Sequence, residues 1–174
     1  MDNPFSIETS RLQCRWLDLA DAAFIYQLVN DPDWLRFIGD KQVSSLGGAR
    51  AYIESGPQAM YQQFGFGLNR VALKDSDTPI GVCGLLKRES LPCADLGFAF
   101  LPEYRGQGFA QEAASAVLQH GCSVLKQTRI AAIVSPQNSA SIKLLEKLGF
   151  DIDDQIQMEP NTASVDLYSI HVES

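Results

Sequence analysis

The segment 95–110 constrains the fold more than any other part of the chain. An apolar run that predicts a strand leads through Arg105-Gly-Gln-Gly108 directly into a long helical pattern. The first backbone N–H groups of a helix have no intrahelical partner and lie at the positive end of the helix dipole. Gly106 and Gly108 can bring that main chain close to a ligand, and Arg105 adds a permanent charge. The segment predicts an anion-binding loop, although a plain strand-to-helix turn could use the same glycines.

Two common phosphate-binding loops do not fit this segment. A P-loop needs a Lys-Ser or Lys-Thr pair after its last glycine, and neither follows Gly108. The dinucleotide fingerprint would place its third glycine at Gln111, and its acidic ribose ligand would fall near Ile130. The pattern therefore disfavours a kinase, an NTPase and a Rossmann dehydrogenase.

Length and composition predict one domain, covering residues 1–174. The 174 residues are 45% hydrophobic and 20% charged, which is ordinary for a soluble globular protein. The net charge of −7 disfavours nucleic acid and membrane surfaces as partners and favours a cationic substrate such as an amine. No apolar run is long enough to span a bilayer, and Met1–Phe5 lacks signal-peptide character, so we expect a cytoplasmic protein. The expected oligomeric state is a monomer or a homodimer. Widely spaced cysteines predict free thiols, and the spacing of His120 and His171 predicts no metal site.

Hydrophobic periodicity predicts seven strands and four helices. The strands are expected at 9–16, 64–73, 79–86, 93–101, 129–134, 151–158 and 165–172, and the helices at 18–29, 44–63, 108–125 and 138–148. The segment Trp34–Gly39 is expected in a loop. Strand 129–134 should return parallel to strand 93–101 across a helical crossover, which makes one βαβ unit. The predicted fold class is α/β, a single domain with a mixed sheet and helices on both faces.

A second motif follows the loop along the chain. Asn138-x-x-Ser141 and Leu148-Gly149-Phe150 come after the central helix and the buried strand. With Arg105, Gly108 and Ala110 matching the loop pattern Arg/Gln-x-x-Gly-x-Gly/Ala, the chain resembles the GNAT superfamily of N-acyltransferases over nearly its whole length. The resemblance implies the GNAT fold, with a mostly antiparallel sheet around the parallel βαβ unit, and acetyl-CoA as co-substrate without a metal.

Shorter motifs resemble one branch of that superfamily more narrowly. Glu8-Thr-Ser-Arg-Leu12, Asn30-Asp-Pro32 and Gly-Phe-Ala-Phe-Leu101 are similar to the branch that contains ribosomal-protein N-terminal acetyltransferases. That branch also holds many members without an assigned substrate.

The resemblance implies how coenzyme A would be bound. Its pyrophosphate would meet Arg105 and the N–H groups of the loop, and Asn138, which also fits a helix N-cap, would bind the pantetheine arm. In the family, strand 93–101 splays from its parallel neighbour, so its backbone would face that arm. The implied cofactor-binding residues are Phe98, Ala99, Phe100, Leu101, Arg105, Gly106, Gln107, Gly108, Phe109, Ala110, Asn138 and Ser141.

Acetyl transfer from a thioester to an amine needs a base, a stabilised oxyanion and a proton for the departing thiolate. The family places a carboxylate before the loop, where Asp95 is available unless it is an exposed strand-start residue without a role. Ser141 matches the position of a thiolate donor in the ribosomal branch, and Tyr168 is the alternative. The backbone N–H of Phe98 or Ala99 would stabilise the oxyanion.

The acceptor stays open at this stage. We expect direct transfer to a primary amine, because no Cys–His pair suggests a covalent intermediate. That amine is either a protein N-terminus or a small molecule, such as a polyamine, an amino acid or an aminoglycoside-like compound. A catalytically weak acyl-CoA-binding module is the other alternative, because Asp95 is shorter than the glutamate that the family leads one to expect.

Overall fold

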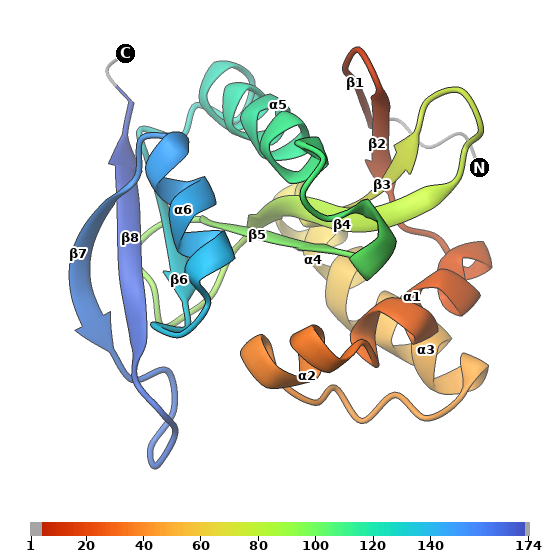
Figure 1. Cartoon of the computed structure of the whole chain (residues 1–174), viewed down its shortest axis with the longest axis horizontal. Coiled ribbons are helices and arrows are strands. Elements are labelled where there is room, and N and C mark those ends of the chain that lie inside the picture. The colour runs from red at the N-terminus through yellow and green to blue at the C-terminus, as the bar shows by residue number, and fades with distance from the viewer. Residues whose placement is uncertain (1–4, 173–174) are drawn as a thin grey trace.

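The computed structural model describes residues 5–172. In this part of the chain the protein is built around an eight-stranded mixed sheet (Figure 1). Its strands are β1 (Ser6–Glu8), β2 (Leu12–Trp16), β3 (Leu68–Leu73), β4 (Pro79–Leu86), β5 (Asp95–Phe100), β6 (Arg129–Val134), β7 (Asp151–Ile156) and β8 (Val165–His171). Their order is β1-β2-β3-β4-β5-β6-β8-β7, and β5–β6 is the one parallel pair among these strands. The predicted α/β fold class, with a mostly antiparallel sheet and a parallel βαβ unit, is confirmed.

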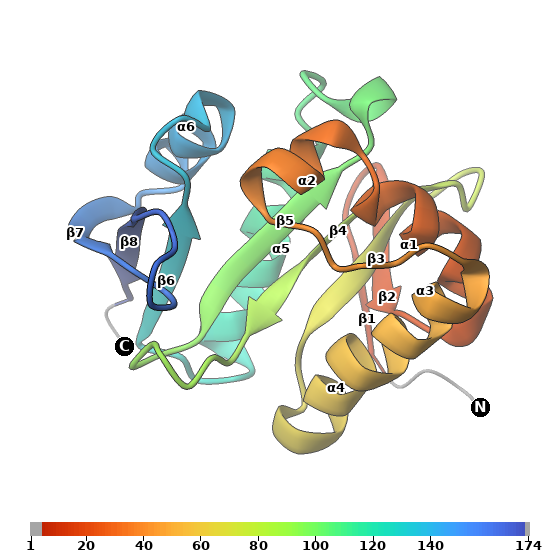
Figure 2. The same ribbon diagram turned by 90° about the horizontal axis from the view of Figure 1, so that it is seen from below.

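Within the described residues, six α-helices cover the two faces of the sheet (Figures 1 and 2). They are α1 (Ala22–Val29), α2 (Pro32–Phe37), α3 (Leu46–Ile53), α4 (Ala59–Phe64), α5 (Phe109–Ser123) and α6 (Ser139–Lys147). One core cluster packs α5 and α6 against the sheet, and a second packs α1 and α3 against the opposite face through Val82 and Leu101. Ala113 and Ala114 are fully buried, as expected for small residues that bring α5 close to the sheet.

The first helical region differs from the prediction at Asp31 and Pro32. The sequence predicted that Asn30-Asp-Pro32 would end a helix and that Trp34–Gly39 would form a loop. The structure instead starts α2 there: Asp31 has extended backbone and accepts hydrogen bonds from the N–H groups of Asp33 and Trp34, and Pro32 is the first helical residue. A proline both ends one helix and favours the first position of the next, so the same residues serve both functions.

Two further outcomes concern short elements. The predicted helix 44–63 begins after Ser45, whose side chain caps it, and a π-helical turn at Glu54–Gln58 divides it where Gly56 and Pro57 weaken a helix. Strand β1 was not predicted, because three residues are too few for a periodic pattern; it pairs Ser6–Glu8 with β2.

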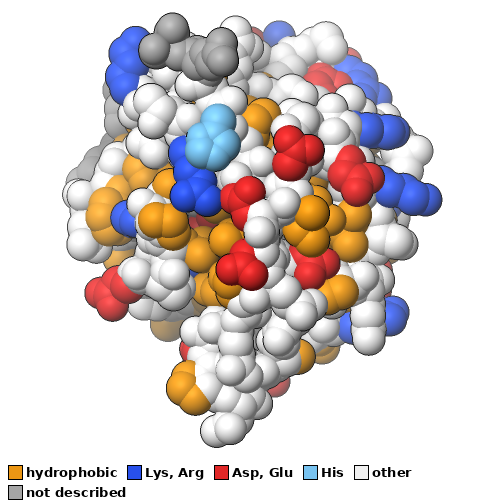
Figure 3. All heavy atoms as spheres, turned by 90° about the vertical axis from the view of Figure 1, so that its left-hand side faces the viewer, with side chains coloured by type: hydrophobic (Ala, Val, Ile, Leu, Met, Phe, Trp, Pro, Cys, Tyr) orange, Lys and Arg blue, Asp and Glu red, His pale blue; other side chains and the backbone are white. Residues whose placement is uncertain are grey.

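Strand β7 forms one edge of the sheet and is exposed along most of its length. It carries Asp151, Asp153 and Asp154, and Figure 3 shows acidic side chains among hydrophobic ones on this side of the molecule. Charges on an edge strand oppose pairing with another chain. Within residues 5–172, no helix is both long and apolar enough to cross a membrane. We predicted from Met1–Phe5 that the chain does not begin with a signal peptide. Residues 1–4 of that segment lie outside the described part.

Candidate active site

The parallel strands β5 and β6 meet at only one end. Asp95 and Ala131 are their single paired position, and the Ala131 N–H donates to the Ala94 carbonyl oxygen at 2.9 Å. Beyond this point the strands diverge, as Figures 1 and 2 show. Most of the β5 edge that faces β6 is therefore left without strand pairing.

Strand alternation identifies which backbone groups occupy this unpaired edge. The Leu101 N–H donates to Ile80 at 2.9 Å, so odd-numbered residues of β5 direct their N–H and C=O toward β4. Even-numbered residues direct theirs toward β6, in agreement with the Ala94 carbonyl. Phe98 and Phe100 thus present backbone groups at the unpaired edge, whereas the N–H of Ala99 faces β4.

The loop after β5 supplies a row of unpaired backbone donors. Gly106 and Gly108 have φ values of +71° and +83°, in the left-handed region that favours glycine. The first backbone hydrogen bond of the following helix runs from the Glu112 N–H to the Gly108 carbonyl oxygen, at 3.1 Å. Within residues 5–172, the backbone N–H groups of 106–111 meet no hydrogen-bond acceptor. This is the geometry of an anion-binding helix start.

The Arg105 side chain lies against α2. Its Nε donates to the Phe100 carbonyl oxygen at 2.9 Å, and its two terminal nitrogens lie 2.6 Å from carboxylate oxygens of Asp31 and Asp33. The charge that was predicted to meet phosphate is therefore balanced by two carboxylates. In this arrangement Arg105 ties the loop to the start of α2.

A second arginine lies on the other side of the loop. The Arg11 guanidinium sits 4.2 Å above the centre of the Phe109 ring, donates to the Gln107 carbonyl oxygen at 3.1 Å and donates to Glu112 at 2.7 Å. Sequence reasoning missed this contact because Arg11 is 96 residues from Gln107 along the chain. The only signal was its place in the short Glu8–Leu12 motif.

The next helix, α6, begins at the same end of the sheet, because β5 and β6 are parallel. Its predicted N-cap is confirmed: Asn138 Oδ1 accepts a hydrogen bond from the Ser141 N–H at 3.3 Å. Among the described residues, no hydrogen bond uses Asn138 Nδ2 or the Ser141 hydroxyl. Both residues are half-buried, so each keeps a polar group available for a ligand.

Asp95 is one of the most deeply buried charged residues of the described chain. Its residue is 1% exposed, and its two carboxylate oxygens lie 3.2 and 3.1 Å from Arg88 Nε. Burial raises the pKa of Asp95 above its ordinary value of 3.8, and Arg88 opposes that rise. The alternative of an exposed strand-start residue is wrong.

Tyr168, the alternative to Ser141 as proton donor to the thiolate, is buried. Such burial does not favour that role. It belongs to the core cluster beneath α5 and α6 and pairs with Ala132, one strand further from β5. Burial raises its pKa, and the nearby Glu146 and Asp166 raise it further. Ser141, at the start of α6, is the more exposed of the two candidates.

Comparison with known proteins identifies relatives of this arrangement. The chain matches the family described as Acetyltransferase (GNAT) domain over residues 11–151. It is 32% identical over 147 residues to the uncharacterized N-acetyltransferase YoaA of Bacillus subtilis, and the match covers 83% of this chain and 81% of that protein.

Solved structures share the fold at lower sequence identity. The ribosomal L7/L12 alpha-N-protein acetyltransferase RimL superposes with a TM-score of 0.82 at 16% identity, covering 97% of this chain and 94% of that one. The spermidine N-acetyltransferase from Vibrio cholerae, in complex with CoA and spermine, superposes with a TM-score of 0.77 at 20% identity, covering 94% and 96%. One neighbour is named for a protein acceptor and the other for a polyamine, so the fold does not select the acceptor.

Proposed function

Because the chain belongs to the GNAT acetyltransferase family, we propose that it transfers the acetyl group of acetyl-CoA directly to a primary amine. The observation that carries this proposal is the set of unpaired backbone groups at the loop and along β5. The N–H groups of 106–111 have no acceptor within the described chain, and β6 leaves the adjacent edge of β5 unpaired. A ligand with a pyrophosphate at one end and a peptide-like arm would satisfy both.

The assignments for coenzyme A follow from this geometry. The N–H groups of Gly106 to Ala110 would bind the pyrophosphate, and the carbonyl of Phe98 and the N–H of Phe100 would pair with the pantetheine arm. The arm would also meet the free Asn138 Nδ2. Arg105 would act by holding the loop, since its terminal nitrogens already contact Asp31 and Asp33. The proposal includes no metal cofactor.

The reaction would proceed in a ternary complex. The amine nitrogen attacks the thioester carbon, the Phe98 N–H stabilises the oxyanion, and the carbon–sulfur bond breaks to release the thiolate of coenzyme A. The attacking nitrogen would lose its remaining extra proton to the Ser141 hydroxyl while that hydroxyl gives its own proton to the thiolate, so Ser141 stays neutral overall. Asp95 would accept the proton of the ammonium through water, because Arg88 covers its carboxylate. Much of the acceleration would come from holding amine and thioester together.

More than one acceptor amine is compatible with the proposed reaction. A protein N-terminus and a small amine both suit a chain with a net charge of −7. The burial of Asp95 beneath Arg88 favours another alternative, a weak acyl-CoA-binding module without an efficient base. We further propose a cytoplasmic location, which the four unpaired cysteines support.

Turnover and binding measurements test the proposal separately. Release of the coenzyme A thiol is measured with acetyl-CoA and a panel of peptides, polyamines and amino acids, and the affinity for coenzyme A is measured by calorimetry. Gly108→Trp should abolish binding, whereas Gly65→Trp serves as the matched control, because Gly65 also has positive φ but lies at the end of α4. Unchanged affinity in Gly108→Trp would remove the loop from the site. Tight binding without turnover of any amine would support the binding module.

A further inference from the structure

Arg88 pairs with Asp95 through only part of its guanidinium. It lies two residues after β4, and its Nε contacts both oxygens of Asp95. The Arg88 side chain is 39% exposed, whereas that of Asp95 is 1% exposed. No hydrogen bond within residues 5–172 uses the four terminal N–H groups of Arg88. The guanidinium therefore compensates the buried carboxylate and leaves a planar fork of donors for a second acceptor.

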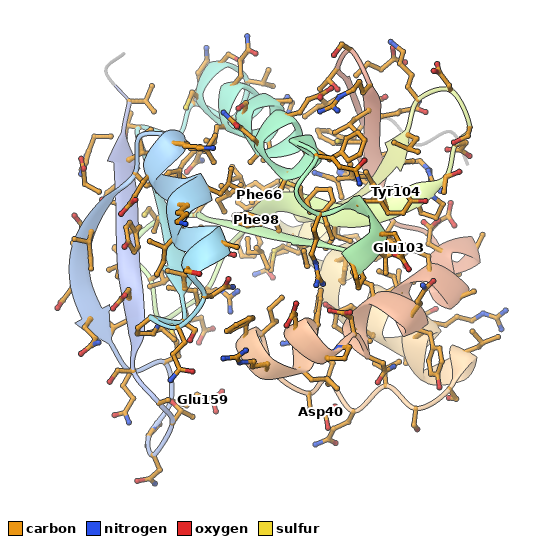
Figure 4. The ribbon with its side chains drawn as sticks, viewed as in Figure 1. Asp40, Phe66, Phe98, Glu103, Tyr104 and Glu159 are labelled. Carbon is orange, nitrogen blue, oxygen red and sulfur yellow. The ribbon has the colours of Figure 1, made fainter. Side chains whose placement is uncertain are left out.

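Two other polar groups lie within electrostatic range of that fork. Burial raises the pKa of Tyr52 on α3, and the Arg88 charge partly opposes that rise. Burial lowers the pKa of Lys41, and the Arg88 charge lowers it further. Glu159, in the hairpin between β7 and β8, acts on Lys41 in the opposite direction. Figure 4 shows Glu159 and Asp40, the neighbour of Lys41, on two separate segments at the same end of the molecule. An anion between Arg88 and Lys41 would relieve their mutual repulsion.

The position along β5 links this cluster to the reacting atoms. Leu96, Phe98 and Phe100 direct their side chains to the α5 core cluster, while Ala99 packs into the cluster of α1 and α3. Asp95 therefore shares the α1 and α3 face of the strand with Ala99. Phe98 lies three residues from Asp95, about 10 Å along the strand. The flexible Arg88 side chain can span part of this distance.

We propose that the free fork of Arg88 binds a carboxylate of the acceptor, which makes the acceptor a free α-amino acid. An amino group two bonds from the bound carboxyl carbon would then lie between Asp95 and the Phe98 N–H. This inference rests on the proposed function, because it assigns the acceptor of that same site. A polyamine would instead bring a second positive charge toward Arg88 and Lys41, and an amidated peptide would lack the anion that the fork accepts.

The test compares acceptors that differ only in the carboxylate. Thiol release is measured for phenylalanine, phenylalaninamide and phenethylamine, for matched sets with other side chains, and for spermidine. The expected result is a kcat/KM for the preferred amino acid at least about tenfold above those of its amide and its decarboxylated amine, as one charge-assisted hydrogen bond would give. Equal or better use of the amides, of the decarboxylated amines or of spermidine would overturn the inference.

Variants separate recognition by Arg88 from a purely structural role. Arg88→Lys keeps a positive charge over Asp95 but loses the fork, so it should reduce the preference for the carboxylate mainly through KM. Arg88→Gln together with Asp95→Asn removes both charges. In binding measurements, this double variant should lose the preference for acceptors that carry a carboxylate. Arg36→Gln is the control, because Arg36 is also an exposed arginine but its guanidinium lies over the Phe37 ring. A uniform loss across all acceptors in Arg88→Lys would indicate a structural role and refute the inference.

Binding measurements keep this inference distinct from the proposed function. If no amine is turned over, calorimetric titration of amino acids and their amides into the coenzyme A complex gives the same comparison. Amino acid binding that depends on Arg88 would support the inference while the transferase proposal fails. Turnover of amines without any preference for the carboxylate would support the transferase and overturn the inference.

Discussion

The ion pairs that join the phosphate loop to α2 allow a quantitative prediction. Asp31 and Asp33 both lie 2.6 Å from Arg105, but the Asp31 side chain is 7% exposed and that of Asp33 is 50% exposed. Asp31 also accepts hydrogen bonds from the N–H groups of Asp33 and Trp34, at 3.1 and 3.4 Å. Equal distances therefore conceal unequal contributions to stability.

Asp31→Ala should lower the free energy of unfolding far more than Asp33→Ala. Loss of the N-cap costs about 1 kcal/mol. Loss of a charge-assisted hydrogen bond adds about 2 kcal/mol, which brings the total for Asp31→Ala to about 3 kcal/mol. The exposed pair of Asp33 contributes about 0.5 kcal/mol. In a chain of 174 residues, the larger loss corresponds to a decrease in Tm of roughly 6–12 °C.

Urea unfolding followed by circular dichroism measures both variants under the same conditions. Asp31→Ser retains a capping oxygen but removes the charge, so its loss should lie between those of the two alanine variants. The affinity for coenzyme A, measured in parallel, should fall more in Asp31→Ala, because the loop loses its main anchor. Equal losses of stability in Asp31→Ala and Asp33→Ala would refute the reasoning from burial and capping.

Three other perturbations test the packing and the titrating groups. Because burial raises the pKa of Asp95 above 3.8, the acidic limb of the kcat/KM profile should lie above that pH, disappear in Asp95→Asn and move further upward in Arg88→Gln. Protonated Asp95 also stabilises the fold at low pH, and the unfolding free energy from this group should fall as pH rises through its folded pKa. Gly84→Ala would drive a Cβ into the Gly67 carbonyl oxygen and should cost about 3 kcal/mol in urea unfolding. Gly47→Ala, in α3, would bring its Cβ no closer than 3.8 Å to the Ser45 hydroxyl and should stabilise by about 0.5 kcal/mol. Burial raises the pKa of Glu112, but hydrogen bonds from Thr9 and Arg11 bring it below its ordinary value. The stabilisation from Glu112 should therefore be lost as pH falls through that pKa, and Glu112→Gln should flatten this part of the unfolding profile.

The sequence predicted elements well where periodicity was strong over a whole segment. Strands 79–86 and 129–134 have the same bounds in the structure, and the central helix differs by one residue at its start and two at its end. The cap at Asn138 was also recognisable, because an asparagine before an amphipathic run satisfies the first N–H groups of a helix. These features depend on neighbours within a few residues, which a single sequence displays.

The charged contacts of the site were not predictable in the same way. Arg105 meets Asp31 across 74 residues and Arg11 meets Glu112 across 101 residues, so no local pattern links the partners. The Asp95 and Arg88 pair is only seven residues apart, but the pairing depends on the conformation of the segment that joins β4 to β5. No local pattern indicates that Asp95 is buried rather than exposed.

These contacts change how the positive charges around the loop can act. Arg11 is held by Glu112 and the Gln107 carbonyl, and Arg105 is held by Asp31, Asp33 and the Phe100 carbonyl. If either arginine moved to bind a phosphate, the carboxylates that it now neutralises would lose their positive partner. One of these carboxylates, Asp31, is buried, so leaving it unpaired would be costly. The backbone N–H groups carry no such cost, because within the described chain they have no acceptor to lose. The main chain of the loop is therefore the better phosphate ligand, and the arginines are better suited to fixing its shape.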